Sequence, residues 1–127
     1  MEQSGPADIV RKLVESINRG DVENALKCYE QDAVLLAQPG QVTKGRQALR
    51  SAIEGFIALK PELRGHAENV VQAGDIALYC SRWTLAGTGP DGKPIEMSGA
   101  SSDVLRRQAD GRWLVVVDNP WGTGILG

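Results

Sequence analysis

The hydrophobic period of this chain changes near Pro61, and that change restricts its possible folds more than any other feature. Before Pro61, apolar residues mostly recur every three or four positions, as on one face of a helix. From Leu63 onward they run in strand-like segments separated by turns that contain Gly and Asp. Helices in one half and hairpin-linked strands in the other predict an α+β domain.

Three helices are expected in the first half. Gly20 supplies the left-handed residue that ends the first helix, and Asp21 caps a second, shorter one. Pro61 ends the third. The three apolar faces consist of Ile9, Val10, Leu13, Val14 and Ile17, then Val22, Ala25, Leu26 and Tyr29, then Leu49, Ala52, Ile53, Phe56 and Ile57.

One short strand, residues 33–37, interrupts the helices and ends in a turn at 38–40. Four further strands follow Pro61, and hairpin turns such as those at Gly74 and Gly111 join them. They span approximately 63–72, 76–86, 94–107 and 112–118. The order predicts helices packed on a curved, mostly antiparallel sheet, in a single domain over residues 1–127.

The last strand is apolar at every position from Trp113 to Val117 rather than at alternate positions. A strand of this kind is covered on both faces. Helices can cover only one face in a chain of 127 residues. We therefore predict a homodimer in which a second copy covers the outer sheet face.

Composition excludes several classes of function. The net charge is −2 and the cations are scattered, so we expect no nucleic-acid binding. No apolar run approaches the ~20 residues that span a bilayer, and the N-terminus has no signal pattern, which predicts a cytoplasmic protein. Cys28 and Cys80 are expected to be free thiols. One histidine and no closely spaced cysteine pair predict no metal site.

Four segments carry a family resemblance, namely Asn18–Asp21, Tyr29–Leu35, Gly45–Leu49 and Asp110–Val116, and a fifth, Val117–Gly122, follows them. In their order and spacing the four resemble the nuclear transport factor 2-like superfamily, and the fifth is similar to small SnoaL-like proteins. The resemblance implies a conical half-barrel with a cystatin-like roll, a deep pocket between sheet and helices, and homodimers. It also implies either enzymes without cofactors, such as ketosteroid isomerase, cyclases and dehydratases, or non-catalytic domains.

The resemblance to ketosteroid isomerase can be followed to individual positions. The tyrosine that donates a hydrogen bond in that enzyme falls at Leu13 here, and the aspartate that shuttles the proton falls near Ala37. The protonated aspartic acid of that enzyme has a counterpart in Asp103. With two of three groups missing, the resemblance argues against the isomerase mechanism as such.

Asp103 and Asp118 are the candidate catalytic residues. Asp103 lies inside a strand, where an unpaired carboxylate is costly to bury. Facing the cone it would be a proton donor with a raised pKa, whereas on the outer face it would pair with an arginine. Asp118 ends the last strand beside Trp121, where it could mark one end of the pocket, form a turn with backbone amides, or do both.

Aromatic residues supply the candidate ligand contacts, namely Tyr29, Tyr79, Trp83 and Trp121. Tyr79, Ser81 and Trp83 share one face of a strand, opposite a face that includes Arg82. Such a face suits an apolar or aromatic ligand, although Tyr and Trp also serve as ordinary core.

Arg82 is a candidate for pairing across an interface or for an acidic ligand. Tyr29 is expected on the second helix, either packed in the core or with its hydroxyl in the cone. His66, near the start of its strand, is interpreted as solvated or structural, and Trp113 as core.

The sequence leaves three functions open. One is a binding module for a small, largely apolar molecule. Another is an enzyme without a cofactor, an isomerase, cyclase, dehydratase or hydrolase, with Asp103 or Asp118 as the acid or base. A pure association domain is a third possibility. Convergence of these carboxyl groups with Tyr79 or Trp83 on one cavity would favour the enzyme.

Overall fold

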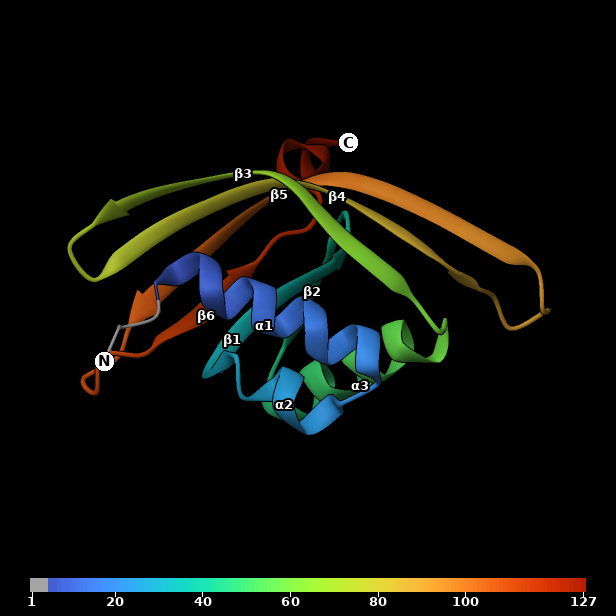
Figure 1. The fold of residues 1–127 in the computed structure, drawn as a ribbon, viewed down its shortest axis with the longest axis horizontal. Coiled ribbons are helices and arrows are strands. Elements are labelled where there is room, and N and C mark those ends of the chain that lie inside the picture. Colours follow the sequence, from blue (N-terminus) through green and yellow to red (C-terminus); the bar gives the residue numbers. More distant parts are fainter. Residues whose placement is uncertain (1–4) are drawn as a thin grey trace.

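The computed structural model describes residues 5–127 and consists of a curved sheet with helices on its concave side. Figure 1 shows the long strands arching over the helices, with α1 running beneath them. Within the described range there are three α-helices, six strands in one sheet and a short 3-10 helix. The predicted α+β class is confirmed.

The first helix ends, and the second begins, where the capping residues predict. α1 spans Pro6–Arg19, and Gly20 follows in the left-handed conformation, with φ of 73°. The side chain of Asp21 then accepts a hydrogen bond of 3.1 Å from the backbone N–H of Asn24, which caps α2 (Val22–Leu26). α3 spans Arg46–Ala58 and buries Leu49 and Ile53.

The strands run in the order β2-β1-β6-β5-β4-β3 across the sheet. β1 pairs in parallel with β6, and every other neighbouring pair is antiparallel. The bounds are β1 Tyr29–Gln38, β2 Gln41–Lys44, β3 Glu62–Ala73, β4 Ile76–Thr88, β5 Pro94–Arg107 and β6 Trp113–Asp118, with η1 at Gly122–Leu126.

Two sequence predictions are corrected near the start of β1. Tyr29, predicted on the second helix, is the first residue of β1, because α2 ends three residues earlier. The strand predicted at 33–37 is longer, and the turn after it leads into β2 rather than directly to a helix. β2 is an edge strand of four residues, mostly exposed, so it has no apolar period to reveal it.

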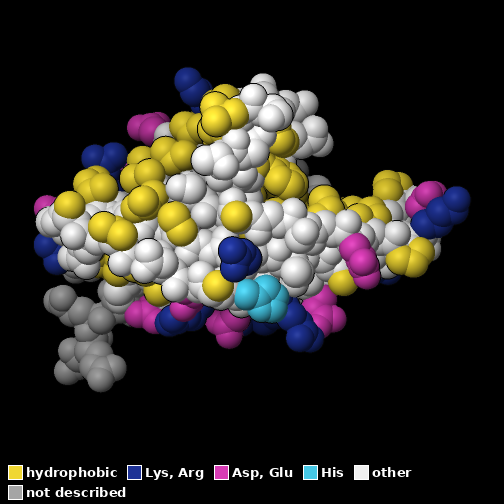
Figure 2. Space-filling model, turned by 90° about the horizontal axis from the view of Figure 1, so that it is seen from above, with side chains coloured by type: hydrophobic (Ala, Val, Ile, Leu, Met, Phe, Trp, Pro, Cys, Tyr) yellow, Lys and Arg dark blue, Asp and Glu magenta, His cyan; other side chains and the backbone are white. Residues whose placement is uncertain are grey.

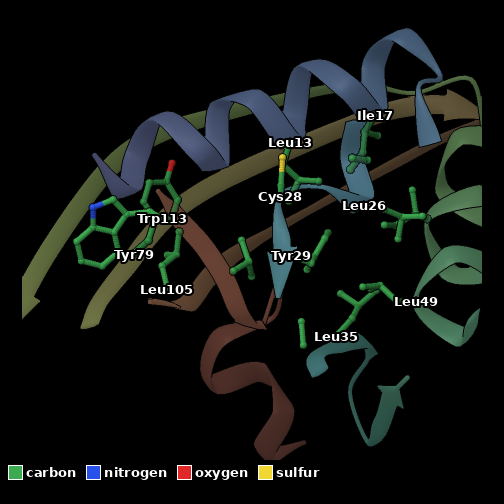
Figure 3. Packing of buried hydrophobic residues seen from close by; sticks show 14 of the residues in the cluster. Leu13, Ile17, Leu26, Cys28, Tyr29, Leu35, Leu49, Tyr79, Leu105 and Trp113 are labelled. Atoms are coloured by element: carbon green, nitrogen blue, oxygen red, sulfur yellow. The ribbon is translucent and has the colours of Figure 1, made fainter. Parts of the chain in front are cut away.

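The core lies between the concave face and the helices. In Figure 3 the side chains of Leu13 and Ile17 point down from α1, and Leu49 of α3 approaches Leu35 of β1. Trp113, predicted as core, is buried there. Burial alternates at the start of β4, so Ala77 and Tyr79 face the helices and Leu78 between them faces outward.

β6 carries a bulge that changes which residues face inward. Leu105 of β5 pairs with Val115, but the residue before it, Val104, pairs with Val117. Val116 is therefore left without a partner on β5. In a regular strand Val115 and Val117 would share a face. The extra residue instead brings Asp118 to the inner side with Val115.

No helix in the described part of the chain has the length and apolar character needed to cross a membrane. Both cysteines are free, Cys28 buried and Cys80 half-buried.

Candidate functional site

A cavity of about 120 Å³ lies between the concave face and the helices. Its walls are mainly apolar, with α1 contributing residues such as Val10 and Leu13 and the sheet contributing residues such as Leu85 and Met97. Arg64 and Gly65 of β3 are exposed, whereas the other described wall residues are buried or half-buried. These two residues of β3 are thus the exposed part of the wall.

Asp103 and Asp118 meet in the wall of this cavity. Asp103 projects inward from β5 and is buried, so of its two possible placements the structure has the inner one. Its Oδ1 accepts a hydrogen bond of 2.8 Å from the backbone N–H of Asn119. Asp118 borders the same part of the wall, close enough for its charge to raise the pKa of Asp103. The bulge at Val116 makes this approach possible, because it turns Asp118 inward.

Tyr29 completes the group. It is buried at the start of β1, and its hydroxyl donates a hydrogen bond of 2.5 Å to Oδ2 of Asp118. β1 and β6 run in parallel with Tyr29 paired to Val115, which brings the two side chains to the same region of the inner face. We call Tyr29, Asp103 and Asp118 the acid cluster.

Burial and mutual repulsion raise the pKa values of both acids. The pKa of Asp103 lies well above its usual range, mainly because burial disfavours its charged form, and because Asp118 is negative. Burial also raises the pKa of Asp118, but the hydrogen bond from Tyr29 opposes that rise. Asp103 is therefore the more readily protonated of the two acids. Burial keeps the phenol of Tyr29 neutral by raising its pKa, and Asp118 adds to the effect.

A second polar chain runs along the inner face of the sheet. The hydroxyls of Ser81 and Ser101 share a hydrogen bond of 3.0 Å. The phenol of Tyr79 donates one of 2.7 Å to Glu68, and Arg11 of α1 binds the other oxygen of that carboxylate at 2.5 Å. These polar groups already have partners in the protein, which leaves the acid cluster as the main polar end of the cavity.

Two tryptophans form the wall near the acid cluster. Trp83 and Trp121 pack edge to face, with ring centroids 5.4 Å apart. The indole N–H of Trp83 donates to the carbonyl of Pro120 at 2.6 Å, and that of Trp121 donates to the carbonyl of Ala37 at 3.2 Å. With both N–H groups bound to backbone, the rings present hydrocarbon surface to the cavity.

All six candidate residues therefore border the same cavity, although their catalytic or binding role stays a prediction. They are Tyr29, Tyr79, Trp83, Asp103, Asp118 and Trp121. Ser81 lies with them on the predicted face of β4, and Arg82 is on the opposite face. His66 is exposed on β3, with Nε2 3.3 Å from the Thr84 hydroxyl, which agrees with a solvated histidine.

The turn after β6 is made by Asn119 rather than by Asp118. The Asn119 side chain donates to the carbonyl of Gly122 at 3.1 Å and accepts from the backbone N–H of Trp121 at 3.2 Å. Asp118 is left free to face the cavity. The positions that correspond to the missing isomerase groups hold Leu13, which lines the cavity, and Ala37.

Sequence reasoning missed the role of Arg46, the first residue of α3. Its guanidinium donates to the backbone carbonyls of Leu26 at 2.6 Å, Tyr29 at 3.3 Å and Glu30 at 3.2 Å. Arg46 thereby holds the junction between α2 and β1, the point at which Tyr29 enters the core. A surface position at a helix start carries no signal for such a role.

The described residues contain no group of three or more His, Cys, Asp or Glu side chains that could hold a metal ion. The acid cluster has only two carboxyl groups, and its third member is the phenol of Tyr29, which binds Asp118.

A family model described as a SnoaL-like domain matches residues 10–116, which is most of the chain. The chain belongs to the SnoaL-like family. A search among curated proteins gives no match.

Solved structures share the fold of this SnoaL-like protein at low identity. A ketosteroid isomerase-like protein from Erwinia carotovora atroseptica is 20% identical, with a TM-score of 0.78 and 89% of each chain covered. An epoxide hydrolase/cyclase-like enzyme, SalBIII, is 17% identical, with a TM-score of 0.72 over 89% of this chain and 86% of its own.

A nuclear transport factor 2-like protein with a cystatin-like fold, from Novosphingobium aromaticivorans, is 19% identical. Its TM-score is 0.73, over 87% of this SnoaL-like chain and 75% of its own. The predicted resemblance and the predicted fold are both confirmed.

Proposed function

We propose that this protein is an enzyme without a cofactor that transfers a proton on a small, largely apolar molecule. The observation that carries the proposal is the acid cluster, in which Asp103, Asp118 and Tyr29 meet at one end of an apolar cavity. Two adjacent carboxyl groups in a buried position are unfavourable for stability, whereas pairs of acids with separated pKa values are typical of acid–base sites.

The charge distribution assigns a role to each acid. Asp118 is the base, because the hydrogen bond from Tyr29 stabilises its ionised form. It would take a proton from a carbon next to a carbonyl group, so that the C–H electron pair moves to the carbonyl oxygen. Asp103 carries a proton and would donate a hydrogen bond to that oxygen. Asp118 would then return its proton to another carbon of the substrate.

Deuterium exchange tests this proposal without knowledge of the natural substrate. Cyclohexanone has exchangeable hydrogens next to its carbonyl, and proton NMR in D2O follows their loss. We expect the protein to accelerate exchange over buffer, and Asp118→Asn to lower the accelerated rate by about 100-fold or more. Glu68→Gln is the matched control, since it removes a carboxylate hydrogen-bonded to a tyrosine outside the acid cluster. Equal rates for the wild type and Asp118→Asn would reject the proposal.

The second candidate is a binding module without chemistry. The apolar walls favour it, because an aromatic and aliphatic lining binds ligands by exclusion from water alone. Ligand NMR distinguishes the two candidates, since a pure binding module would bind cyclohexanone without accelerating its exchange.

We further propose that a second copy of the chain covers the outer sheet face. Val71, Ile76 and Leu78 are exposed there at the end near the β3–β4 turn, with Leu78 40% exposed. Half-buried residues of β5 and β6 adjoin them, and Figure 2 shows hydrophobic side chains gathered over this part of the face. They include Val104, Leu114, Val116 and Val117. Apolar surface of this kind is typical of association between copies.

A further inference from the structure

The volume of the cavity restricts the choice of ligand more than the chemistry of the cavity walls does. Sites for drug-sized ligands enclose about 300–1,000 Å³. The cavity here measures about 120 Å³. An apolar cavity of roughly 150 Å³ holds a single benzene molecule. From these volumes we infer that the natural ligand is a single-ring molecule with one oxygen-bearing end, which the acid cluster binds.

The wall that limits the cavity is held by hydrogen bonds, so it does not move aside easily for a larger ligand. Rotation of Trp83 would break its bond of 2.6 Å to the Pro120 carbonyl, and rotation of Trp121 would break its bond to Ala37. Both losses leave half-buried polar groups without their protein partners. The edge-to-face packing of the two rings couples their positions.

Gly99 explains how Trp83 reaches this position. Gly99 of β5 lies directly opposite Trp83 of β4 in the sheet. A Cβ atom on Gly99 would lie 2.9 Å from Cζ2 of Trp83 and 3.0 Å from the Pro120 carbonyl oxygen. The indole therefore rests on a backbone without a side chain. A methyl group at position 99 would lift the indole toward the cavity.

The single oxygen-bearing end follows from the partners of the other polar wall groups. Ser81 and Ser101 bind each other, and Tyr79 binds Glu68. A ligand with a second polar group in the interior would face Trp83, Trp121 or aliphatic walls. An unpaired polar group in such surroundings lowers affinity. This inference deepens the proposed function and rests on it for the polar end.

Phenol and 2-naphthol test the size limit, because they carry the same hydroxyl and differ by one ring. Calorimetry with the full chain should show that the wild type binds phenol at least about tenfold more tightly than 2-naphthol. Hydrophobic burial alone predicts the reverse order, since 2-naphthol has more apolar surface. Tighter binding of 2-naphthol by the wild type would overturn the inference, and so would no binding of either compound at millimolar concentration.

Two variants change the cavity in opposite directions. Trp83→Leu enlarges it and should reverse the preference in favour of 2-naphthol. Gly99→Ala narrows it and should weaken phenol binding at least about tenfold. Gly55→Ala is the matched control, because it adds the same methyl group on an exposed position of α3, where the described structure has no atom within 4 Å of it. The size limit would be overturned if Trp83→Leu kept the wild-type preference for phenol and Gly99→Ala kept the wild-type affinity for phenol.

The size limit and the acid–base proposal fail in different ways. If Asp118→Asn leaves cyclohexanone exchange unchanged while phenol is still preferred over 2-naphthol, the enzyme proposal fails and the size limit stands. If 2-naphthol binds more tightly while Asp118→Asn abolishes exchange, the size limit fails and the enzyme proposal stands.

Discussion

The hydroxyl of Tyr29 donates a hydrogen bond of 2.5 Å to Oδ2 of Asp118, although 89 residues separate the two in the chain. Their proximity depends on the parallel pairing of β1 with β6 and on the bulge at Val116. The bond stabilises the charged form of Asp118 in a buried site. In the proposed mechanism it thereby separates the roles of the two acids, with Asp118 as base and Asp103 as proton donor.

Tyr29→Phe should shift the pH dependence of the proposed exchange reaction. Without the phenol, Asp118 loses a hydrogen bond that lowers its pKa, so its pKa rises. A base with a higher pKa becomes protonated at higher pH, so the acid limb of the rate profile moves to higher pH. Exchange rates measured across a pH series check this, and unfolding by urea should show a loss of about 1 kcal/mol.

Tyr79→Phe is the matched control for this experiment. Its phenol also borders the cavity, but it donates to Glu68 rather than to Asp118. The control should lose a similar amount of stability and keep the acid limb of the wild type. An acid limb that is unchanged in Tyr29→Phe would contradict the assigned role of Tyr29.

Asp103→Asn should remove a pH-dependent loss of stability. The pKa of Asp103 is raised in the folded state, so the unfolded chain releases this proton first as pH rises. Wild-type stability therefore falls from about pH 4, the ordinary range of the carboxyl group, up to the raised pKa. The amide that replaces the carboxyl group does not titrate, so we expect the variant to be more stable at neutral pH by about 0.5–2 kcal/mol. The difference should disappear at acid pH.

Urea unfolding of both proteins at several pH values measures this difference. Asp110→Asn is a control of opposite sign, because hydrogen bonds from the backbone and side chain of Arg112 lower the pKa of Asp110. The stability from Asp110 is present at neutral pH and is lost as pH falls through the lowered pKa. A stability gain in Asp103→Asn that is independent of pH would show that ionisation of Asp103 is not its cause.

The helices and the hairpin strands were predictable because their signals are local. The face of α1, the left-handed Gly20 and the cap at Asp21 each involve residues within a few positions of one another. Tyr29 was assigned to the wrong element because its spacing from Val22 and Leu26 fits a helical face. The change from α2 to β1 depends instead on pairing with β6 and on Arg46, contacts that are distant in sequence.

The acid cluster was predictable only in part. Alternation along β4 groups Tyr79 with Trp83, but it does not say which side of the sheet carries the helices. The bulge at Val116 leaves no pattern, because every residue from Trp113 to Val117 is apolar. Strict alternation would place Asp118 on the face opposite Val115. The proximity of Asp103 and Asp118 could therefore not be predicted from the sequence and is seen only in the register of β5 and β6.

Leu78→Asp should convert the proposed dimer to a monomer. Leu78 lies within the apolar outer face, where a buried carboxylate without a partner would be costly. Sedimentation velocity at micromolar concentration should show a dimer for the wild type and a monomer for the variant. Val42→Asp places the same charge on an exposed valine of β2, at the far edge of the sheet, and should remain dimeric. A monomeric wild type would reject the proposed interface.

Arg46→Lys should disturb the acid cluster from a distance. The planar guanidinium of Arg46 donates to the carbonyls of Leu26, Tyr29 and Glu30, and a lysine ammonium cannot reproduce that geometry. Carbonyls that lose their donor become poorly satisfied, so we expect a loss of about 1–3 kcal/mol in the free energy of unfolding. A looser start of β1 also weakens the bond from Tyr29 to Asp118, so the acid limb of exchange should move toward higher pH, as in Tyr29→Phe.

Arg50→Lys is the matched control for Arg46→Lys, because Arg50 lies on the same helix but binds Glu23 at the surface. Exposed ion pairs of this kind contribute about 0–1 kcal/mol, so the control should unfold nearly as the wild type does. Its acid limb should stay in place, since Arg50 donates to no backbone carbonyl of the α2–β1 junction in the described structure. A stability loss in Arg46→Lys without any shift of the acid limb would mean that Arg46 supports the fold but does not position Tyr29.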